Sequence, residues 1–245
     1  MTSPQAARPD LRHVENWIFD LDNTLYAAEC RLFAQIDARM TAFIRDRLSL
    51  PHWRARKLQK SYYVEYGATM NGLMERHGVC PDEFLEYVHD IDLSPIHKNE
   101  PLAAALAALP GRKFIFTNGS VRHAENVAGA LGVLPLIDEI FDIKAAGYAP
   151  KPRREPYEKF LAAHGVEARS AIMFEDIIQN LETPAALGMT TVLVHSDAAW
   201  LDDEPHEKRP ARPGDNAPHV HYVTDDIAAF LTGAELEKDA TEERS

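Results

Sequence analysis

One stretch near the start of the chain, WIFDLDNTLY at residues 17–26, places two carboxylates directly after an apolar run. The apolar residues favour a buried β-strand, and the Asn-Thr pair behind the second carboxylate is typical of a turn. We therefore expect the first strand over residues 14–22. Because successive side chains of a strand point to opposite faces, Asp20 and Asp22 should project the same way. They would lie at the carboxyl end of the strand, where open α/β sheets bind their ligands.

Two carboxylates this close repel each other and raise one another's pKa unless a cation lies between them. Mg²⁺ is the hard divalent cation that would best keep both ionised. An N-capping aspartate with a surface neighbour is the alternative interpretation. The rest of the chain decides between the two.

The length and composition are ordinary for a soluble globular protein. A chain of 245 residues can form one large domain, or a core with a smaller domain. It has no apolar run near the roughly 20 residues of a membrane span and no secretory signal at its start, so we expect no membrane partner. Two cysteines, Cys30 and Cys80, make no disulfide framework, which favours the cytoplasm. A net charge of −12 without a basic tract argues against a nucleic acid polymer.

The segment after the first strand is helical in pattern. Apolar residues recur at steps of three and four from residue 33 to residue 48, and no strand pattern interrupts residues 27–97. Beyond Pro101, short apolar runs alternate with helical segments, which requires a parallel sheet with helical crossovers. The expected strands are 113–117, 140–143, 171–174, 190–194 and an edge strand at 221–223.

These patterns predict an α/β fold, a doubly wound parallel sheet with an inserted small α-helical domain. We expect the α/β core at 10–26 and 98–233, and the helical domain at 27–97. The terminal segments 1–9 and 234–245 are expected to be flexible tails. Residues 196–218, rich in charged residues and proline, are expected to form a long loop whose role the sequence does not indicate.

Polar residues recur at three further points that follow strands or turns. Thr117-Asn118 comes between a predicted strand and a helix whose N-cap is Ser120, a place where hydroxyl, amide and backbone N–H groups can bind an anion. Lys151 has proline on both sides, which stiffens its backbone. Glu175-Asp176 ends another apolar strand, so its carboxylates should converge on the same crevice as Asp20. Taken singly, a strand-end threonine, a solvated lysine and a capping aspartate are ordinary features.

Together the four positions supply what phosphoryl transfer to a carboxylate requires. That reaction needs a nucleophile, a proton carrier, a metal, and donors for the phosphate oxygens. The four motifs, in this order, resemble those of the haloacid dehalogenase (HAD) superfamily, over about residues 15–195. The helical insertion is similar to the cap that this superfamily carries between its first and second motifs.

The resemblance implies roles for the catalytic pair and the phosphate-binding residues. By it, Asp20 is the nucleophile that forms an aspartyl-phosphate, and Asp22 is the general acid and then the general base. Thr117 and Asn118 would hold phosphate oxygens. Lys151 would neutralise charge on the nucleophile and the phosphoryl group.

The resemblance also implies a cofactor, Mg²⁺. Its ligands would be Asp20, the main-chain carbonyl of Asp22, and Asp176, with Glu175 nearby or acting through water. A dehalogenase uses the same nucleophile but needs neither the second carboxylate nor the metal, so Asp22 and Asp176 argue against that activity.

Within the superfamily, the chain is most similar to the pyrimidine 5′-nucleotidase branch. The match rests on DNTLY after the first aspartate, on the segment 62–74, and on 88–93. Many relatives have Pro-Asp-Pro after the lysine, whereas here Pro152 is followed by Arg153 and Arg154, whose role the sequence leaves unassigned. The tyrosines of the 62–74 segment could stack on a base or pack the cap against the core.

The resulting hypothesis is a Mg²⁺-dependent phosphomonoesterase that hydrolyses pyrimidine nucleoside monophosphates. The alternatives are a phosphatase of another small metabolite, such as phosphoglycolate or a sugar phosphate, a sugar-phosphate mutase, or a non-catalytic module that binds phosphometabolites. The expected partner is a small phosphate ester. A monomer and a homodimer are both compatible with the sequence.

Overall fold

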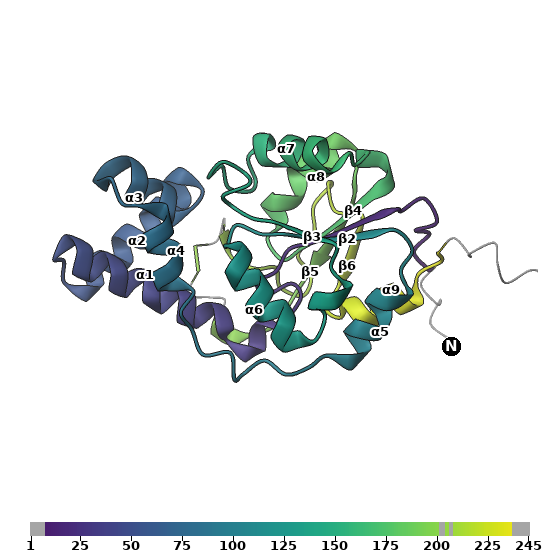
Figure 1. Ribbon diagram of the computed structural model, residues 1–245, viewed down its shortest axis with the longest axis horizontal. Helices are drawn as coiled ribbons and strands as arrows, with labels where there is room; N and C mark the ends of the chain where they lie inside the picture. Colours follow the sequence, from purple (N-terminus) through teal and green to yellow (C-terminus); the bar gives the residue numbers. More distant parts are fainter. Residues whose placement is uncertain (1–7, 201–203, 206–207, 237–245) are drawn as a thin grey trace, which may run out of the picture.

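The computed structural model describes residues 8–200, 204–205 and 208–236. Within these residues, six parallel strands form one sheet in the order β3-β2-β1-β4-β5-β6 (Figure 1). The strands are β1 (Asn16–Phe19), β2 (Arg112–Phe116), β3 (Glu139–Phe141), β4 (Ala171–Glu175), β5 (Thr190–Val194) and β6 (Tyr222–Thr224). The chain builds outward from β1 in one direction as far as β3, and then returns to the other side of β1. This order confirms the predicted doubly wound parallel sheet.

Helices cover both faces of the sheet. Figure 1 shows α7 and α8 on one face, and α5, α6 and α9 on the other. The bounds of these helices are α5 (Glu100–Ala108), α6 (Val121–Leu131), α7 (Arg154–His164), α8 (Glu182–Leu187) and α9 (Ile227–Gly233). We call the sheet and these helices the core.

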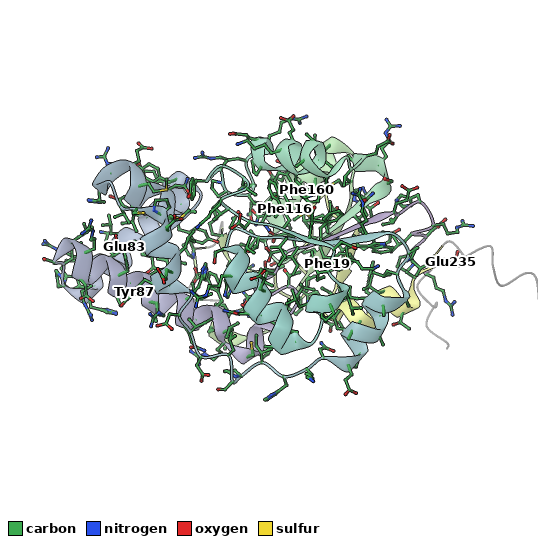
Figure 2. The ribbon with its side chains drawn as sticks, viewed as in Figure 1. Phe19, Glu83, Tyr87, Phe116, Phe160 and Glu235 are labelled. Atoms are coloured by element: carbon green, nitrogen blue, oxygen red, sulfur yellow. The ribbon has the colours of Figure 1, made fainter. Side chains whose placement is uncertain are left out.

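The alternation of the strand residues explains the two layers. Phe19 and its neighbour Phe174 on β4 face the cluster that contains α5, α6 and α9, whereas Ile18 faces the cluster that contains α7. On β2, Phe116 likewise faces α7, where its ring stacks on that of Phe160 at 5.4 Å between centroids (Figure 2). Both faces of the central strands are buried, so their sequences are continuously apolar.

The residues between β1 and α5 form four helices that pack on one another, to the left of the sheet in Figure 1. They are α1 (Leu32–Leu48), α2 (His52–Tyr66), α3 (Thr69–His77) and α4 (Pro81–Val88), and we call them the cap. The cap has its own hydrophobic cluster, built around Phe43, Ile44 and Leu73. Helices α2 and α3 approach so closely that a Cβ on Gly72 would lie 2.4 Å from Cγ of Tyr62.

The first strand is shorter than predicted, since it ends at Phe19 rather than at residue 22. The N–H of Asp20 still donates to the carbonyl of Phe174, at 2.9 Å. The chain then turns, because the N–H groups of Thr24 and Leu25 both donate to the carbonyl of Leu21. The two carboxylates therefore lie on the turn that follows the strand.

The ends of the described chain are joined to each other. Pro9 accepts a hydrogen bond from the N–H of Glu235, and Leu11 donates one to the carbonyl of the same residue. Most of the two predicted tails lies outside the described residues. None of the described helices is long and apolar enough to span a membrane.

Candidate active site

The predicted site residues meet at the carboxyl edge of the sheet, beside β1, where the strand order reverses. Asp20 follows β1, Thr117 and Asn118 follow β2, and Glu175 ends β4. The strand register aligns Phe19 with Ile115 on one side and with Phe174 on the other. Asp20 and Glu175, the next residues along β1 and β4, therefore lie side by side. Open α/β sheets bind ligands at this switch point.

Lys151 lies at the centre of the site and is almost completely buried. Its ammonium group donates to Oδ1 of Asp20 at 2.6 Å and to the carbonyl of Phe116 at 2.9 Å, and it pairs with Oε1 of Glu175 at 2.7 Å. Burial by itself lowers the pKa of this lysine, but the two carboxylates raise it above its usual value. The group therefore stays charged at neutral pH.

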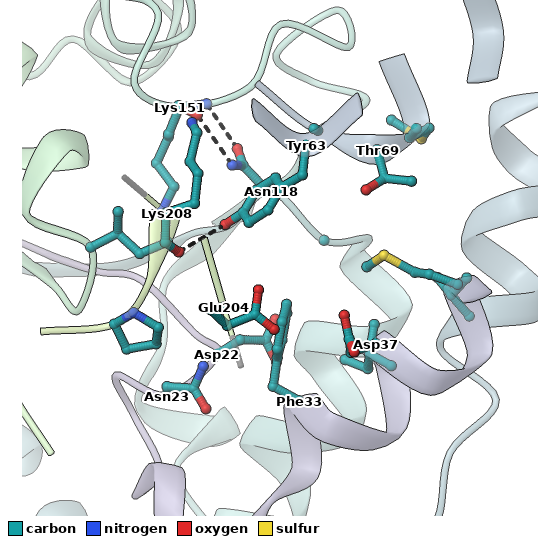
Figure 3. A pocket seen from close by; sticks show the side chains of 18 of the residues that line it. Asp22, Asn23, Phe33, Asp37, Tyr63, Thr69, Asn118, Lys151, Glu204 and Lys208 are labelled. Atoms are coloured by element: carbon teal, nitrogen blue, oxygen red, sulfur yellow. Dashed lines mark hydrogen bonds between the residues drawn. The ribbon is translucent and has the colours of Figure 1, made fainter. Parts of the chain in front are cut away.

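Asn118 and Thr117 support the lysine and the turn after β2. Oδ1 of Asn118 accepts the N–H of Lys151 at 2.9 Å, and its amide nitrogen lies 3.5 Å from the Lys151 carbonyl (Figure 3). The buried hydroxyl oxygen of Thr117 accepts the N–H of Gly119 at 2.9 Å. Asn118 lines the cleft described below, together with Gly119.

Three buried carboxylates, those of Asp20, Glu175 and Asp176, have oxygens within 4.8 Å of one another. Glu175 is already engaged, because it also accepts the N–H of Ile177 at 2.8 Å and the side-chain amide of Asn180 at 2.6 Å. Among the described residues, only Lys151 donates to the Asp20 side chain, through Oδ1, so its Oδ2 is open.

The acid cluster has too little positive charge of its own. Burial raises the pKa of Asp20 to about 7, and Glu175 adds to the effect, although Lys151 opposes it. Burial and the same glutamate raise the pKa of Asp176 well above its usual value. Carboxylate oxygens that lack a counter-charge are the donor set that Mg²⁺ prefers. The residues present therefore fit a divalent cation, with Oδ2 of Asp20 and the carboxylate of Asp176, whose Oδ1 lies 3.5 Å from the hydroxyl of Thr24, as its ligands.

Asp22 lies outside this cluster and has different partners. Its Oδ1 accepts a hydrogen bond from the hydroxyl of Tyr26 at 2.7 Å and from Nε2 of His123 at 2.9 Å. Burial raises the pKa of Asp22, but His123 and the two hydrogen bonds outweigh it and leave the pKa below its usual value. The first aspartate is thus bound to the lysine and the second to a histidine.

A cleft between the cap and the core opens onto these residues. Its core side is lined by the two aspartates of the first motif and by Lys151. Its cap side is lined by side chains of α1, α2 and α4, among them Phe33, Asp37 and Tyr63 (Figure 3). The cleft contains about 1020 Å³ of empty space, including the part that is open to solvent. Small-molecule sites commonly have volumes up to this size.

The cap side of the cleft carries an ion cluster. Lys60 of α2 pairs with Asp37 of α1 at 2.5 Å and with Glu204 of the 196–218 loop at 2.7 Å. The described part of this loop also contacts Tyr63, whose hydroxyl lies 3.5 Å from the carbonyl of Lys208. The loop therefore forms part of the cleft wall and links the core to the cap.

The two arginines after Lys151 have separate partners. Arg153 donates to the carbonyl of Tyr66 at 3.3 Å, which connects the core to the end of α2. Arg154 pairs with Glu158 one turn further along α7.

Four residues that contact Asp22 or line the cleft were not predicted from the sequence: Tyr26, His123, Asp37 and Lys60. His123 lies in the first turn of the helix after Thr117-Asn118, and that position was a usable signal. The sequence does not indicate that His123 contacts Asp22, because the two residues are 101 positions apart in the chain. The pairing of Asp37 with Lys60 depends on how α1 and α2 pack, which the sequence does not specify.

Comparison with known proteins identifies the family of the chain. The haloacid dehalogenase-like hydrolase family model matches residues 17–188, and the chain belongs to this family. Phosphate metabolism protein 8 of Saccharomyces cerevisiae (strain ATCC 204508 / S288c) is 30% identical over 136 residues, which are 51% of this chain and 42% of that protein. The match thus spans less than half of the relative.

Two solved structures show the same fold at low sequence identity. The HAD phosphatase from Thermococcus onnurineus has a TM-score of 0.57 and 17% identity, over 90% of this chain and 99% of that one. The L-2-haloacid dehalogenase from Xanthobacter autotrophicus has a TM-score of 0.53 and 14% identity, over 89% and 97%. At these identities the likeness concerns the fold, and the site itself has to indicate the reaction.

Proposed function

We propose that this protein is a Mg²⁺-dependent phosphomonoesterase that works through an aspartyl-phosphate on Asp20. Pyrimidine nucleoside 5′-monophosphates are the proposed substrates. The proposal depends above all on one observation. A lysine-bound carboxylate and a histidine-bound carboxylate lie two residues apart and line one cleft, beside a third, uncompensated carboxylate.

The two carboxylates of the first motif suit the two halves of the reaction. In the first half, an oxygen of Asp20 bonds to phosphorus, the bond to the leaving oxygen breaks, and Asp22, which enters this step as the protonated carboxylic acid, gives that oxygen its proton and becomes a carboxylate. In the second half, Asp22 takes a proton from water, whose oxygen bonds to phosphorus, and inorganic phosphate leaves Asp20. The second carboxylate separates this proposal from a dehalogenase, which has no leaving oxygen to protonate.

The buried lysine and the metal ligands provide the positive charge that the reaction needs. Lys151 touches the nucleophile and stays charged, so it opposes the negative charge of the phosphoryl group. Asp20 and Asp176 would hold Mg²⁺, with Glu175 behind them. When bound, the ion supplies positive charge that neutralises these acids and the phosphate oxygens.

The substrate class is inferred from the cap. The rings of Phe33 and Tyr63 line the cleft, and aromatic rings of this kind can contact a base through stacking. The resemblance of the cap segment to pyrimidine 5′-nucleotidases supports the same assignment. The name of the yeast relative, Phosphate metabolism protein 8, agrees with phosphate chemistry but identifies no substrate.

A phosphate-release screen tests the proposal. The purified protein is assayed with UMP, CMP, phosphoglycolate and sugar phosphates, with Mg²⁺ and with EDTA. We expect release from UMP and CMP in Mg²⁺ only, and loss of turnover in Asp20→Asn with phosphate binding retained. Preference for phosphoglycolate or a sugar phosphate would replace the substrate assignment, and transfer without release would indicate a mutase. Absence of release from every ester would indicate a binding module, and activity retained in Asp20→Asn would contradict the mechanism.

A further inference from the structure

The contacts of Asp22 point to a residue that the mechanism above does not use. Both hydrogen bonds to its carboxylate, from Tyr26 and His123, end on Oδ1. No described residue donates a hydrogen bond to Oδ2, and Asp22 lines the cleft. The two donors therefore fix the rotation of the carboxylate and leave one oxygen for the substrate side.

His123 can fix the orientation of the Asp22 carboxylate because its own position is tightly constrained. It is only 1% exposed, in the first turn of α6. Because a carboxylate oxygen is an acceptor, Nε2 must carry a hydrogen to make the 2.9 Å contact with Asp22. The hydroxyl of Tyr26 likewise donates its hydrogen to Oδ1, at 2.7 Å. Both partners of the carboxylate are thus donors.

The ring of His123 is held in turn by a residue that follows the cap. His89 comes directly after α4 and stacks on His123, with ring centroids 4.3 Å apart and planes 7° from parallel. Nδ1 of His89 lies 3.0 Å from Oγ of Ser120, the same oxygen that caps α6 by accepting the N–H of His123. The stack therefore crosses the boundary between cap and core.

We propose that His123, held by its stack with His89, is a positioning residue for the proton transfers of Asp22. The inference rests on the proposed function. His123 keeps its proton throughout, while Oδ2 of Asp22 passes one proton to the leaving oxygen and later removes one from water. Because His89 stands at the end of the cap and stacks on His123 of the core, the alignment of Asp22 depends on how cap and core pack together.

The test compares two esters that differ in their need for a proton. The leaving oxygen of UMP is an alkoxide and must be protonated, whereas p-nitrophenolate leaves without a proton. The ratio kcat/KM reports the steps up to release of the leaving group, and kcat also includes hydrolysis of the phosphoenzyme. Loss of alignment should therefore lower kcat/KM for UMP. For p-nitrophenyl phosphate it should lower kcat and KM together.

The first variants are His123→Leu and His123→Gln, the second of which restores an N–H donor at a similar reach. In His123→Leu we expect kcat/KM for UMP to fall about 10- to 100-fold, a part of the roughly 10²- to 10⁴-fold effect of acid–base catalysis. In the same variant, kcat/KM for p-nitrophenyl phosphate should change less than about 3-fold, because its leaving group needs no proton. His123→Gln should recover most of the loss.

The second pair, His89→Ala and His89→Phe, tests the stack and keeps the test possible if His123→Leu does not fold. Phenylalanine preserves a flat ring, so His89→Phe should stay close to wild type while His89→Ala shows the selective loss for UMP. His164→Leu is the matched control. It removes a histidine that packs on Phe160 at the α7 face of the sheet, opposite the face covered by α6, and it should affect both esters alike.

Equal losses of kcat/KM for the two esters, or no recovery in His123→Gln, would contradict the role of His123 and leave the proposed function standing. Failure of the wild-type protein to hydrolyse either ester would contradict the proposed function instead. If wild type hydrolyses another alkyl phosphate in place of UMP, that ester takes its place in the comparison.

Discussion

Two buried clusters of charge face the same cleft, and their electrostatics are opposite. In the core, burial and neighbouring carboxylates raise the pKa of Asp20 and of Asp176. In the cap, burial also acts to raise the pKa of Asp37, but Lys60 and Arg56 lower it to below its usual value. The pKa values shift in opposite directions because Asp37 has two cationic neighbours, whereas the core acids have mainly Lys151.

The cap cluster is neutralised within the protein, whereas the core cluster is not. Asp37 accepts hydrogen bonds from Arg56, Gln59 and Lys60, at 2.7, 2.7 and 2.5 Å, so its charge is compensated within the protein. Among the described residues, Lys151 is the one cation that pairs with the core acids, and it contacts Asp20 and Glu175 but not Asp176. An uncompensated cluster at a strand edge is expected at a catalytic centre, where charge is completed by metal and substrate. A compensated cluster stabilises the wall of the cleft.

The largest expected effect is the loss of the one lysine in the core cluster. Lys151→Met should lower kcat about 10³-fold, as removal of a charge-stabilising donor does in other enzymes. The exposed Lys159, which pairs with Glu155 on α7, provides the control. Steady-state kinetics of both variants measure the effect, and a loss in Lys159→Met equal to that in Lys151→Met would refute it.

Magnesium should distinguish the two clusters directly. At 100 times its Kd, a ligand that binds only the folded state stabilises it by about 2.7 kcal/mol. We expect Mg²⁺ to raise the Tm of the wild type and of Asp37→Asn, but not that of Asp176→Asn. Thermal unfolding with and without EDTA measures this shift. A shift retained in Asp176→Asn would mean that the metal binds elsewhere.

The pH dependence of stability should have opposite signs in the two clusters. Without metal, Asp20 titrates at about 7 when folded and at about 3.8 when unfolded. The folded state then binds more protons between these values, so the free energy of unfolding should fall as the pH rises from about 4 to about 7. The pKa of Asp37 is lowered, so its contribution is present at neutral pH and is lost at acid pH, as the pH falls through its folded pKa.

Chemical denaturation across this pH range measures both signs. Asp20→Asn should reduce the fall in the free energy of unfolding between about pH 4 and pH 7. Saturating Mg²⁺ should reduce it in the same way. Asp37→Asn should keep the fall and lower the stability mainly at neutral pH. If the difference in free energy of unfolding between the metal-free wild type and Asp20→Asn did not change between about pH 4 and pH 7, the assignment of Asp20 would be contradicted.

The smallest expected effect is on the ion pair that joins the cap to the 196–218 loop. Lys60→Met and Glu204→Gln should each raise KM for the nucleotide several-fold with little change in kcat, because the pair shapes the cleft wall and not the reacting groups. In a double-mutant cycle we expect a coupling of about 1 kcal/mol. Additive effects on KM would show that the pair is not coupled to binding.

Much of the core was predictable because strand patterns and motif positions are local. The run before Asp20, the proline-flanked Lys151 and the acidic end of β4 each carry their own signal, and a parallel sheet brings such strand ends to one edge. The end of β1 was predicted three residues too late. The strand ends early because the chain turns where the N–H groups of Thr24 and Leu25 donate to the carbonyl of Leu21. The helical insertion was predicted as a whole, but not which of its side chains face the cleft.

The sequence by itself determined the α/β class, the edge of the sheet at which chemistry can occur, and the residue types present there. It did so because alternation, helical spacing and turn residues are properties of neighbours in the chain. Only the tertiary structure decided that Glu175 is committed to Lys151, that His123 contacts Asp22, and that Lys60 reaches Glu204 across the cleft. Those contacts join residues that are distant in the chain, and packing of cap against core sets which donors meet which acids.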